Sequence, residues 1–285
     1  MKRILLYAVL LAALAGCGRN RFDSIDIAAS EKTFSALREG FSSVPDSIPE
    51  GRTAFLLSQG VPVADVLVFG GEVGDSLRPC PPIPYGYACE SVSSAELMDS
   101  LHVVSQRLYT DGGLNARMLY LADPRMSVAA VNKVAELADK GAFIGGVKPV
   151  ECLSGDVSVF QRTVEKVWLS GNVMSGKTVQ SILKAAGVKP DVDTKVDSLV
   201  FQHRHLPDAE IYHITNQGSH SGKIRVGFRV RGRLPLQWNP DTGEISTVGY
   251  KLKKNRTNVT FYTVPGDDTF IVFASFAEKR KLKAD

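Results

Sequence analysis

A carboxylate that follows two glycines and a short apolar run is the first candidate for chemistry in this sequence. Residues 64–69 are rich in β-branched side chains and are bounded by Pro62 and by Gly70-Gly71, which predicts a buried parallel strand. In open α/β sheets, ligands bind outside the carboxyl ends of such strands, and Glu72 stands at that position. Because glycines allow a ligand to approach closely, Glu72 is a candidate catalytic general acid or base. The alternative is a polar residue that ends a strand or a charge at the N-terminus of a helix.

Two other patterns could serve a metal ion or a phosphate. His203 and His205 alternate on one predicted strand and would supply two metal ligands, but no third ligand follows, so we predict no metal site. Residues 171–178 fit the phosphate-loop pattern G-x-x-x-x-G-K-T. A phosphate loop needs an apolar strand before it, whereas residues 157–169 have the spacing of an amphipathic helix. We therefore expect no nucleotide partner.

Charge excludes one further class of partner. The formal net charge is +4, and the basic residues are spread along the chain apart from residues 279–283 near its end. A nucleic-acid surface needs clustered cations with interleaved aromatic residues. We therefore expect no nucleic-acid partner, and we interpret residues 277–285 as a basic tail.

The N-terminus predicts export and a lipid anchor. Lys2 and Arg3 precede an apolar run over residues 4–14 and then small residues, which is the pattern of a secretory signal. Residues 14–17, Leu-Ala-Gly-Cys, resemble the bacterial lipobox, in which the cysteine is lipidated and becomes the new N-terminus. The resemblance implies a signal peptide over residues 1–16, lipidation of Cys17 and a membrane partner through that lipid. Gly18, where an acidic residue would favour inner-membrane retention, favours the outer membrane.

Export into an oxidising compartment permits disulfides. Cys80 and Cys89 flank a proline-rich loop that could bring the two sulfur atoms together. Two free thiols are the alternative, and Cys152 would be the remaining cysteine.

The elements that position these residues change character along the chain. We expect a tether with one short helix over residues 17–52, the helix covering residues 30–40. Over residues 53–193, strands alternate with helices at 94–101, 128–140, 157–169 and 178–186, which predicts a flavodoxin-like or amidotransferase-like α/β domain with a mostly parallel sheet. Over residues 194–276, seven short strands separated by turn residues predict a β-sandwich.

Five motifs in this order link the chain to a known family. They are residues 59–72 with the strand and its Gly-Glu end, the helix–Gly–strand unit at 128–148, the Gly-Lys-Thr helix at 175–191, IYHITNQ at 211–217 and FRVRGRLPLQWNPDTGE at 228–244. Together they resemble the α-L-rhamnosidases of glycoside hydrolase family 106 over about residues 53–275. The resemblance implies glycan chemistry. It also makes Trp238 a candidate for stacking on a sugar ring, with a packed core tryptophan as the alternative.

The sequence also departs from that family. The family places a large (β/α) barrel with the catalytic function before this segment, and residues 17–52 leave no room for one. The family's Gly-Tyr-Asp-Tyr-Asp stretch reads Gly-Tyr-Ala-Cys-Glu at residues 86–90, so the first acid is lost. Its calcium ligands find no match, and we expect no cofactor. The hypotheses are an accessory or carbohydrate-binding protein, a rhamnosidase completed by a separate barrel-containing chain, and a structural envelope lipoprotein.

Overall fold

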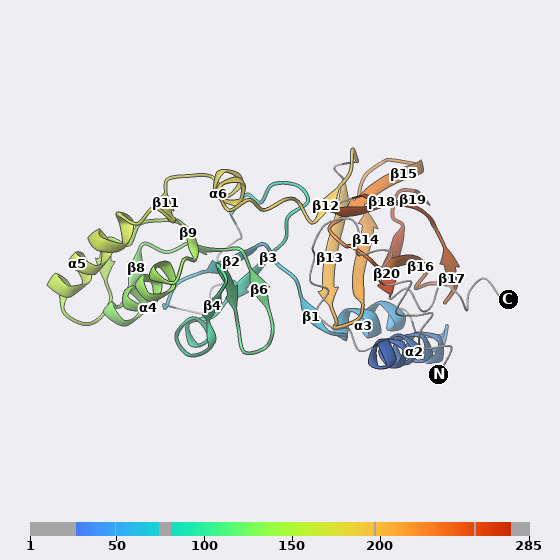
Figure 1. Ribbon diagram of the computed structural model, residues 1–285, viewed down its shortest axis with the longest axis horizontal. Coiled ribbons are helices and arrows are strands. Elements are labelled where there is room, and N and C mark those ends of the chain that lie inside the picture. The colour runs from blue at the N-terminus through green and yellow to red at the C-terminus, as the bar shows by residue number, and fades with distance from the viewer. Residues whose placement is uncertain (1–26, 49, 74–80, 197, 254, 275–285) are drawn as a thin grey trace, which may run out of the picture.

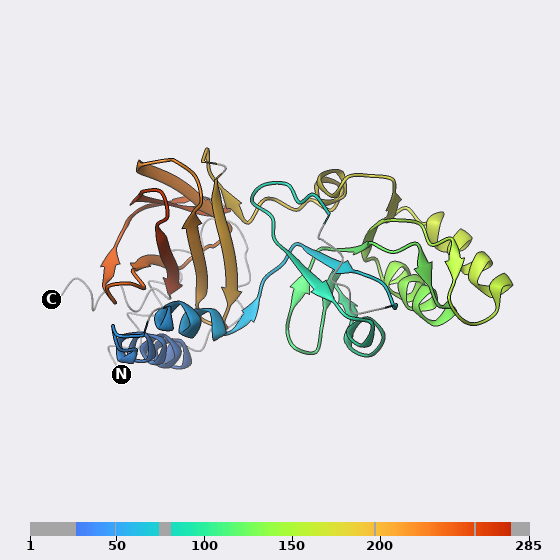
Figure 2. The same cartoon turned by 180° about the vertical axis from the view of Figure 1, so that it is seen from behind.

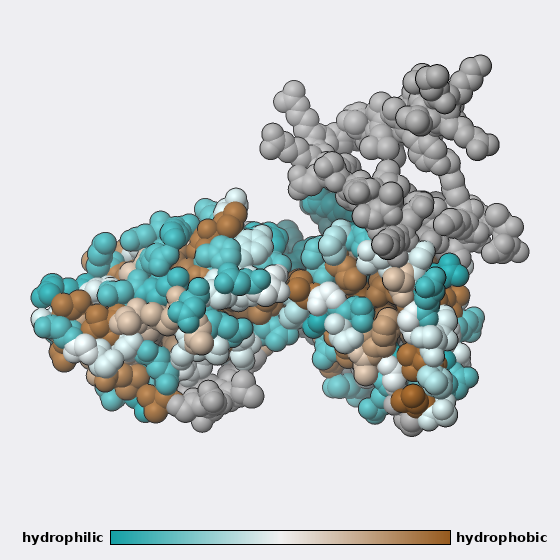
Figure 3. Space-filling view, turned by 90° about the horizontal axis from the view of Figure 1, so that it is seen from below, coloured by the Kyte–Doolittle hydropathy of each residue, from teal (hydrophilic) through white to brown (hydrophobic). Residues whose placement is uncertain are grey.

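The computed structural model describes residues 27–48, 50–73, 81–196, 198–253 and 255–274, with side chains from residue 33 onward. The predicted signal peptide, Cys17, Cys80 and the basic tail lie outside these residues. The described chain forms two lobes side by side (Figure 1). Seen from below, a narrower middle part joins the lobes (Figure 3). No helix within the described ranges is long and apolar enough to cross a membrane.

The first lobe is built on a parallel sheet of five strands. The sheet order is β11 (Val173–Ser175), β9 (Phe143–Gly146), β7 (Met118–Leu121), β2 (Val66–Phe69) and β3 (Cys89–Val92). All neighbouring strands are parallel. Numbered along the chain, this order reads 2-1-3-4-5 from the β3 edge, which is the order of flavodoxin-like sheets. It supports the flavodoxin-like assignment, which stays a proposal.

Helices cover both faces of this sheet, which explains the continuous apolar run in β2. Leu67 and Phe69 share a core with α4 (Val128–Asp139), α5 (Val157–Trp168) and the π-helical turn η1 (Glu96–Ser100). Val66 and Val68 face the opposite way and pack against α6 (Val179–Ala185). Every residue of β2 is therefore buried, and the prediction of a buried parallel strand at this place is confirmed.

Two smaller sheets complete the first lobe. The antiparallel strands β4 (His102–Val104), β5 (Arg107–Tyr109) and β6 (Asn115–Ala116) form one of them, and a turn that includes residues 111–113 joins β5 to β6. The parallel pair β8 (Arg125–Met126) and β10 (Glu151–Cys152) forms the other.

The second lobe contains two antiparallel sheets. One has the order β1 (Val61–Pro62), β13 (Leu199–His205), β14 (Glu210–Asn216), β20 (Asp268–Ala274), β16 (Leu234–Trp238) and β17 (Ile245–Thr247). The other has the order β12 (Val192–Asp193), β15 (Gly222–Phe228), β19 (Arg256–Thr263) and β18 (Gly249–Lys253). Inward side chains of both sheets, among them Tyr212, Phe228 and Phe273, form a common core. This arrangement supports the proposed β-sandwich.

Two helices cover the outer face of the six-stranded sheet (Figure 1). They are α2 (Ile27–Ser43), which is longer than the predicted helix at residues 30–40, and α3 (Gly51–Ser58). Phe34 and Phe41 of α2 pack on Trp238, with ring centroids 5.8 and 4.9 Å away. Trp238 is fully buried by these contacts. A sugar ring cannot reach it, so the core interpretation replaces the sugar-stacking one.

The chain crosses between the lobes twice. It leaves the second lobe after β1, which pairs with β13, and it returns just before β12, which pairs with β15 (Figure 2). The second lobe is thus made of two separate stretches of chain. The predicted boundaries at residues 52 and 193 differ from this division. The packing of α2, α3 and β1 with the later strands was not predicted, since no local sequence pattern indicates a contact between residues so distant along the chain.

Phe41 tests whether α2 is an integral layer of the second lobe. Because Phe41 is fully buried, Phe41→Ala is expected to lower the free energy of unfolding of this lobe by about 3–5 kcal/mol. In a Trp168→Phe background, Trp238 is the remaining tryptophan, and its fluorescence during urea unfolding reports this lobe. Val200→Ala, at a residue that is 46% exposed, is the control. It should change the free energy of unfolding of this lobe by less than about 0.5 kcal/mol. Equal effects of the two variants would contradict the assignment.

Candidate functional site

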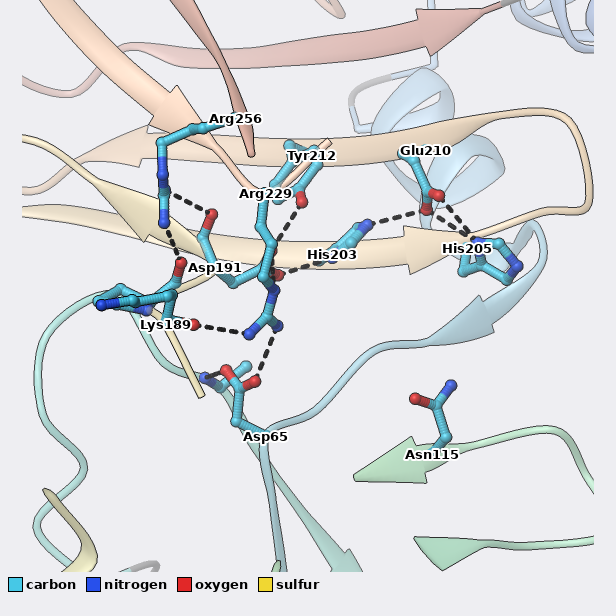
Figure 4. Close-up of polar contacts among 12 residues, drawn as sticks. Asp65, Asn115, Lys189, Asp191, His203, His205, Glu210, Tyr212, Arg229 and Arg256 are labelled. Atoms are coloured by element: carbon cyan, nitrogen blue, oxygen red, sulfur yellow. Dashed lines mark hydrogen bonds and ion pairs between the residues drawn. The ribbon is translucent and has the colours of Figure 1, made fainter. Parts of the chain in front are cut away.

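An arginine ties together the two crossings between the lobes. Arg229 follows β15, and its Nη2 donates to Oδ1 of Asp65 at 2.7 Å on the outgoing crossing. Its Nε lies 3.4 Å from Oδ1 of Asp191 on the returning crossing, and its Nη1 donates to the carbonyl of Lys189 at 2.7 Å. Both carboxylates are almost completely buried. Figure 4 shows the guanidinium between these groups, so one side chain contacts both crossings.

The buried network continues from Asp191 into the second lobe. Nδ1 of His203 lies 2.7 Å from Oδ2 of Asp191, and the hydroxyl of Tyr212 donates to Oδ1 at 2.8 Å. The imidazole of His203 also stacks on the ring of Tyr212 with centroids 3.9 Å apart. On its other side, Nε2 of His203 lies 3.0 Å from Glu210 (Figure 4). Both ring nitrogens therefore face carboxylates, which is the environment of a protonated histidine.

The charges in this network shift one another's pKa values. Burial alone would lower the pKa of His203, but the carboxylates of Asp191 and Glu210 raise it to about 9. Burial alone would raise the pKa of Asp191, but His203, Arg229 and Tyr212 lower it to about 2. Desolvation raises the pKa of Asp65, against the opposing effect of Arg229. The Asp191–His203 pair is therefore ionised over the neutral range.

A groove of about 350 Å³ opens beside this network, between the two lobes. Its walls come from α3, β1, the start of β3 and β13. The residues that line it are Leu57, Pro62, Val63, Tyr87, Ala88, Cys89, Glu90, Phe201, Gln202, His203 and Arg204. A volume of this size lies within the range of small-ligand sites.

A carboxyl group, that of Glu90, and a guanidinium group, that of Arg204, are the features of interest among the lining residues. Glu90 is exposed and makes no ion pair or hydrogen bond with any residue that the structure describes. Partial loss of water around its carboxyl group raises its pKa, against the opposing charge of Arg204. Arg204 is held in place, since its Nε and Nη2 donate to the carbonyls of Gln59 and Gly60 at 2.8 Å. The groove thus presents a carboxyl group with unused hydrogen-bonding capacity beside a fixed guanidinium.

Close backbone packing positions the segment that carries Glu90. The amides of Asp191 and Val192 donate to the carbonyl of Gly86 at 2.6 and 3.1 Å. Gly86 has φ of 83°, and a Cβ atom there would lie 2.0 Å from the carbonyl oxygen of Val192. Only glycine fits such a contact. The hydroxyl of Tyr87 donates to the carbonyl of Val188 at 3.0 Å, which fixes the same segment.

The structure places Glu72 far from this groove. Glu72 follows the carboxyl end of β2, whereas the groove and Asp65 lie near the amino ends of the same sheet. The carboxylate of Glu72 accepts hydrogen bonds from the backbone amide and the hydroxyl of Ser127, at 2.5 and 2.6 Å. Ser127 is the N-cap of α4, so Glu72 contributes a negative charge at a helix N-terminus. This contact matches the alternative in which Glu72 is a charge at the N-terminus of a helix. The catalytic role of Glu72 stays a prediction.

The two histidines of the predicted strand share one carboxylate partner, and the cysteines lie elsewhere. His203 and His205 both contact Glu210, while His213 pairs with Asp268 on another part of the sheet. No group of three metal-ligating side chains occurs in the described ranges. Cys89 is in a disulfide and Cys152 is free. The pairing of Cys89 with Cys80 stays a prediction, because Cys80 is outside the described part.

Comparison with known proteins identifies the family. The family model described as alpha-L-rhamnosidase, Glyco_hydro_106, matches residues 50–252. The chain belongs to this family. The resemblance predicted from the five motifs is therefore confirmed. A prokaryotic membrane lipoprotein lipid attachment site matches residues 1–17, which supports a lipid-anchored place in the cell envelope.

Two relatives show how much of such a protein the chain represents. A rhamnosidase structure from Novosphingobium sp. PP1Y is 28% identical, with a TM-score of 0.71, over 79% of this chain and 24% of that one. A putative beta-glucuronidase from Formosa agariphila is 28% identical over 80% of this chain and 21% of its own length. The chain thus spans less than a quarter of the length of either relative.

The Asp191–His203 pair predicts how stability depends on pH. The pKa of His203 is raised from 6.5 to about 9. Its contribution to the free energy of unfolding is therefore complete below pH 6.5 and is lost as the pH rises through 9. The unfolding free energy of the second lobe is expected to fall by about 3 kcal/mol at most over that interval. The contribution of Asp191 is present above pH 3.8 and is lost as the pH falls towards 2.

Urea unfolding at a series of pH values, followed by Trp238 fluorescence, measures this dependence. His203→Gln should remove the decline between pH 6.5 and 9. His102→Gln in the first lobe is the control and should retain it. An unchanged decline in His203→Gln would show that another group titrates.

Proposed function

We propose that this chain is a lipid-anchored, glycan-handling protein of the rhamnosidase family that binds sugar between its lobes and has no glycosidase activity of its own. The observation that carries the proposal is the unpartnered carboxyl group of Glu90, which lines the inter-lobe groove with Arg204. We also propose that the lipid at Cys17 places it in the outer membrane, supported by Gly18 after the cysteine.

The groove has the chemistry that a sugar requires. A carboxylate accepts hydrogen bonds from adjacent hydroxyl groups, and a fixed guanidinium donates to ring or hydroxyl oxygens. Phe201 and Tyr87 add apolar surface among the lining residues. A volume of about 350 Å³ accommodates one or two sugar units rather than a long chain. The family match and the names of the two relatives favour rhamnose or glucuronate as the sugar.

Hydrolysis is not favoured by the same residues. Glycosidases use two carboxyl groups about 5–10 Å apart on either side of the scissile bond. Glu90 is the one acidic residue among those that line the groove, and Glu72 lies beyond the other end of the sheet. The position that would supply a further acid in the family's motif is Ala88. The groove therefore supports binding better than bond cleavage.

A second candidate is an α-L-rhamnosidase whose site is completed by a separate chain. It is favoured by one observation, which is that the chain covers 24% of the length of the solved rhamnosidase. A third is a structural envelope lipoprotein that retains the fold without ligand binding.

Calorimetry and an activity assay on the full chain in detergent separate these candidates. The proposal predicts binding of methyl α-L-rhamnoside or glucuronate, and no turnover of an aryl α-L-rhamnoside with calcium present. Glu90→Gln should weaken binding at least tenfold, because it removes the carboxylate from the groove. Glu72→Gln is the matched control and should leave affinity within twofold.

The alternatives predict other results. Turnover that Glu72→Gln abolishes would establish an active rhamnosidase and contradict the proposal. Turnover only after addition of a barrel-containing chain would favour the second candidate. Absence of both binding and turnover would favour the structural lipoprotein.

A further inference from the structure

The outward face of the four-stranded sheet carries a cluster of cations. Along β15 and β19, alternate side chains such as Val226 and Val259 point into the shared core. The residues between them point outward, and so do Lys251 and Lys253 of the neighbouring strand β18, which are in register with Asn258 and Arg256. Four exposed cations therefore occupy this face: Lys223, Arg225, Lys251 and Lys253. None of the four has an ion pair or a hydrogen bond with the residues that the structure describes. We call these four residues and the sheet surface around them the basic face.

Acidic residues do not neutralise the basic face. The strands of this sheet carry a single carboxylate on the outward side, Asp193 of β12, which is in register with Gly227 of β15. The next residues in this row are Asn258 and then Lys251. Three strand spacings, roughly 14 Å, therefore separate Asp193 from Lys251, beyond the Debye length at physiological salt. The charges of Lys251 and Lys253 on β18 are therefore not compensated by a carboxylate of these strands.

The basic face has a hollow of about 220 Å³. It is lined by Arg225, Tyr250, Lys251, Lys253, Asn258 and Thr260. The side chain of Asn258 lines this hollow, and its amide nitrogen is buried without a hydrogen-bond acceptor among the described residues. Beside the hollow, the ring of Tyr262 is 71% exposed, and Tyr262 is in register with Lys223. A recess lined by three cations beside an exposed aromatic ring is more than an evenly charged surface.

We propose that the basic face is a second binding site, which takes a segment of an anionic polysaccharide bearing carboxylate or sulfate groups. Lysine and arginine side chains pair with such anions, and the tyrosine ring offers a flat surface to a sugar ring. The outward face of a sheet is an extended surface, which suits a segment of a polymer chain. The site is independent of the groove and goes beyond the function proposed for it.

The layer order of the second lobe favours a polysaccharide over the lipid surface that holds the anchor. The helices α2 and α3 cover the six-stranded sheet, and the basic face is the outer surface of the other sheet. The two therefore lie on opposite sides of the lobe (Figure 1). Cys17 precedes α2 by ten residues, and α2 lies on the helix-covered side of the lobe. The basic face accordingly points away from that side.

Affinity measurements on the full chain in detergent test the site. The probes are polygalacturonate for carboxylates, dextran sulfate for sulfates, and neutral dextran. We expect binding to at least one anionic polymer, weakening as salt is raised, and none to neutral dextran. Lys251→Glu with Lys253→Glu should reduce the affinity at least tenfold, and Arg225→Gln alone at least threefold. Lys148→Glu with Lys184→Glu, two exposed lysines of the first lobe, is the charge-matched control and should stay within twofold.

Several results would overturn the proposal. They are equal binding to neutral dextran, equal loss in the control pair, or binding to vesicles containing phosphatidylglycerol without binding to either anionic polymer. The last result would assign the basic face to membrane contact. Because Glu90→Gln does not touch this face, it should leave polygalacturonate binding unchanged. The experiment can therefore contradict the binding proposed for the groove and the binding proposed for the basic face separately.

Discussion

A guanidinium held between two buried carboxylates is the side-chain contact that joins both crossings between the two lobes. Arg229 pairs with Asp65 on the outgoing crossing and with Asp191 on the returning one, and both carboxylates are almost completely buried whereas the Arg229 side chain is 29% exposed. Removal of one partner of a buried ion pair leaves an uncompensated charge, which typically costs about 3–5 kcal/mol. The two crossings are therefore fixed with respect to the end of β15. The groove, whose walls come from both lobes, takes its shape from this contact.

The same constraint explains why the groove lies where it does. Doubly wound sheets bind ligands beyond the carboxyl ends of their strands. Here that end of β2 leads to Glu72, whose carboxylate is engaged by Ser127 at the start of α4. The amino ends instead face the second lobe, where β13 and the segment that begins β3 form opposite walls. Packing a second lobe against the sheet has thus created a recess at the end where none is expected.

The sequence predicted local features well and long-range placement poorly. The apolar run of β2, the capped helix α4 and the strand β16 follow from periodicity and turn residues that lie close together in the chain. The burial of Trp238 depends on Phe34 and Phe41, about 200 residues earlier, so sequence spacing carried no sign of it. Arg229 and Glu90 were missed for the same reason. The family motif matched to residues 86–90 includes Glu90, and the loss of an acid at Ala88 was the one signal in the sequence that this segment matters.

The most direct test is a double-mutant cycle on methyl α-L-rhamnoside affinity, because neither residue involved lines the groove. If Arg229 and Asp65 set the groove by holding the lobes, Arg229→Gln and Asp65→Asn should each weaken binding at least tenfold. The double variant should then bind no more weakly than either single one, since both changes break the same contact. Affinities that are unchanged, or losses that multiply in the double variant, would contradict the account.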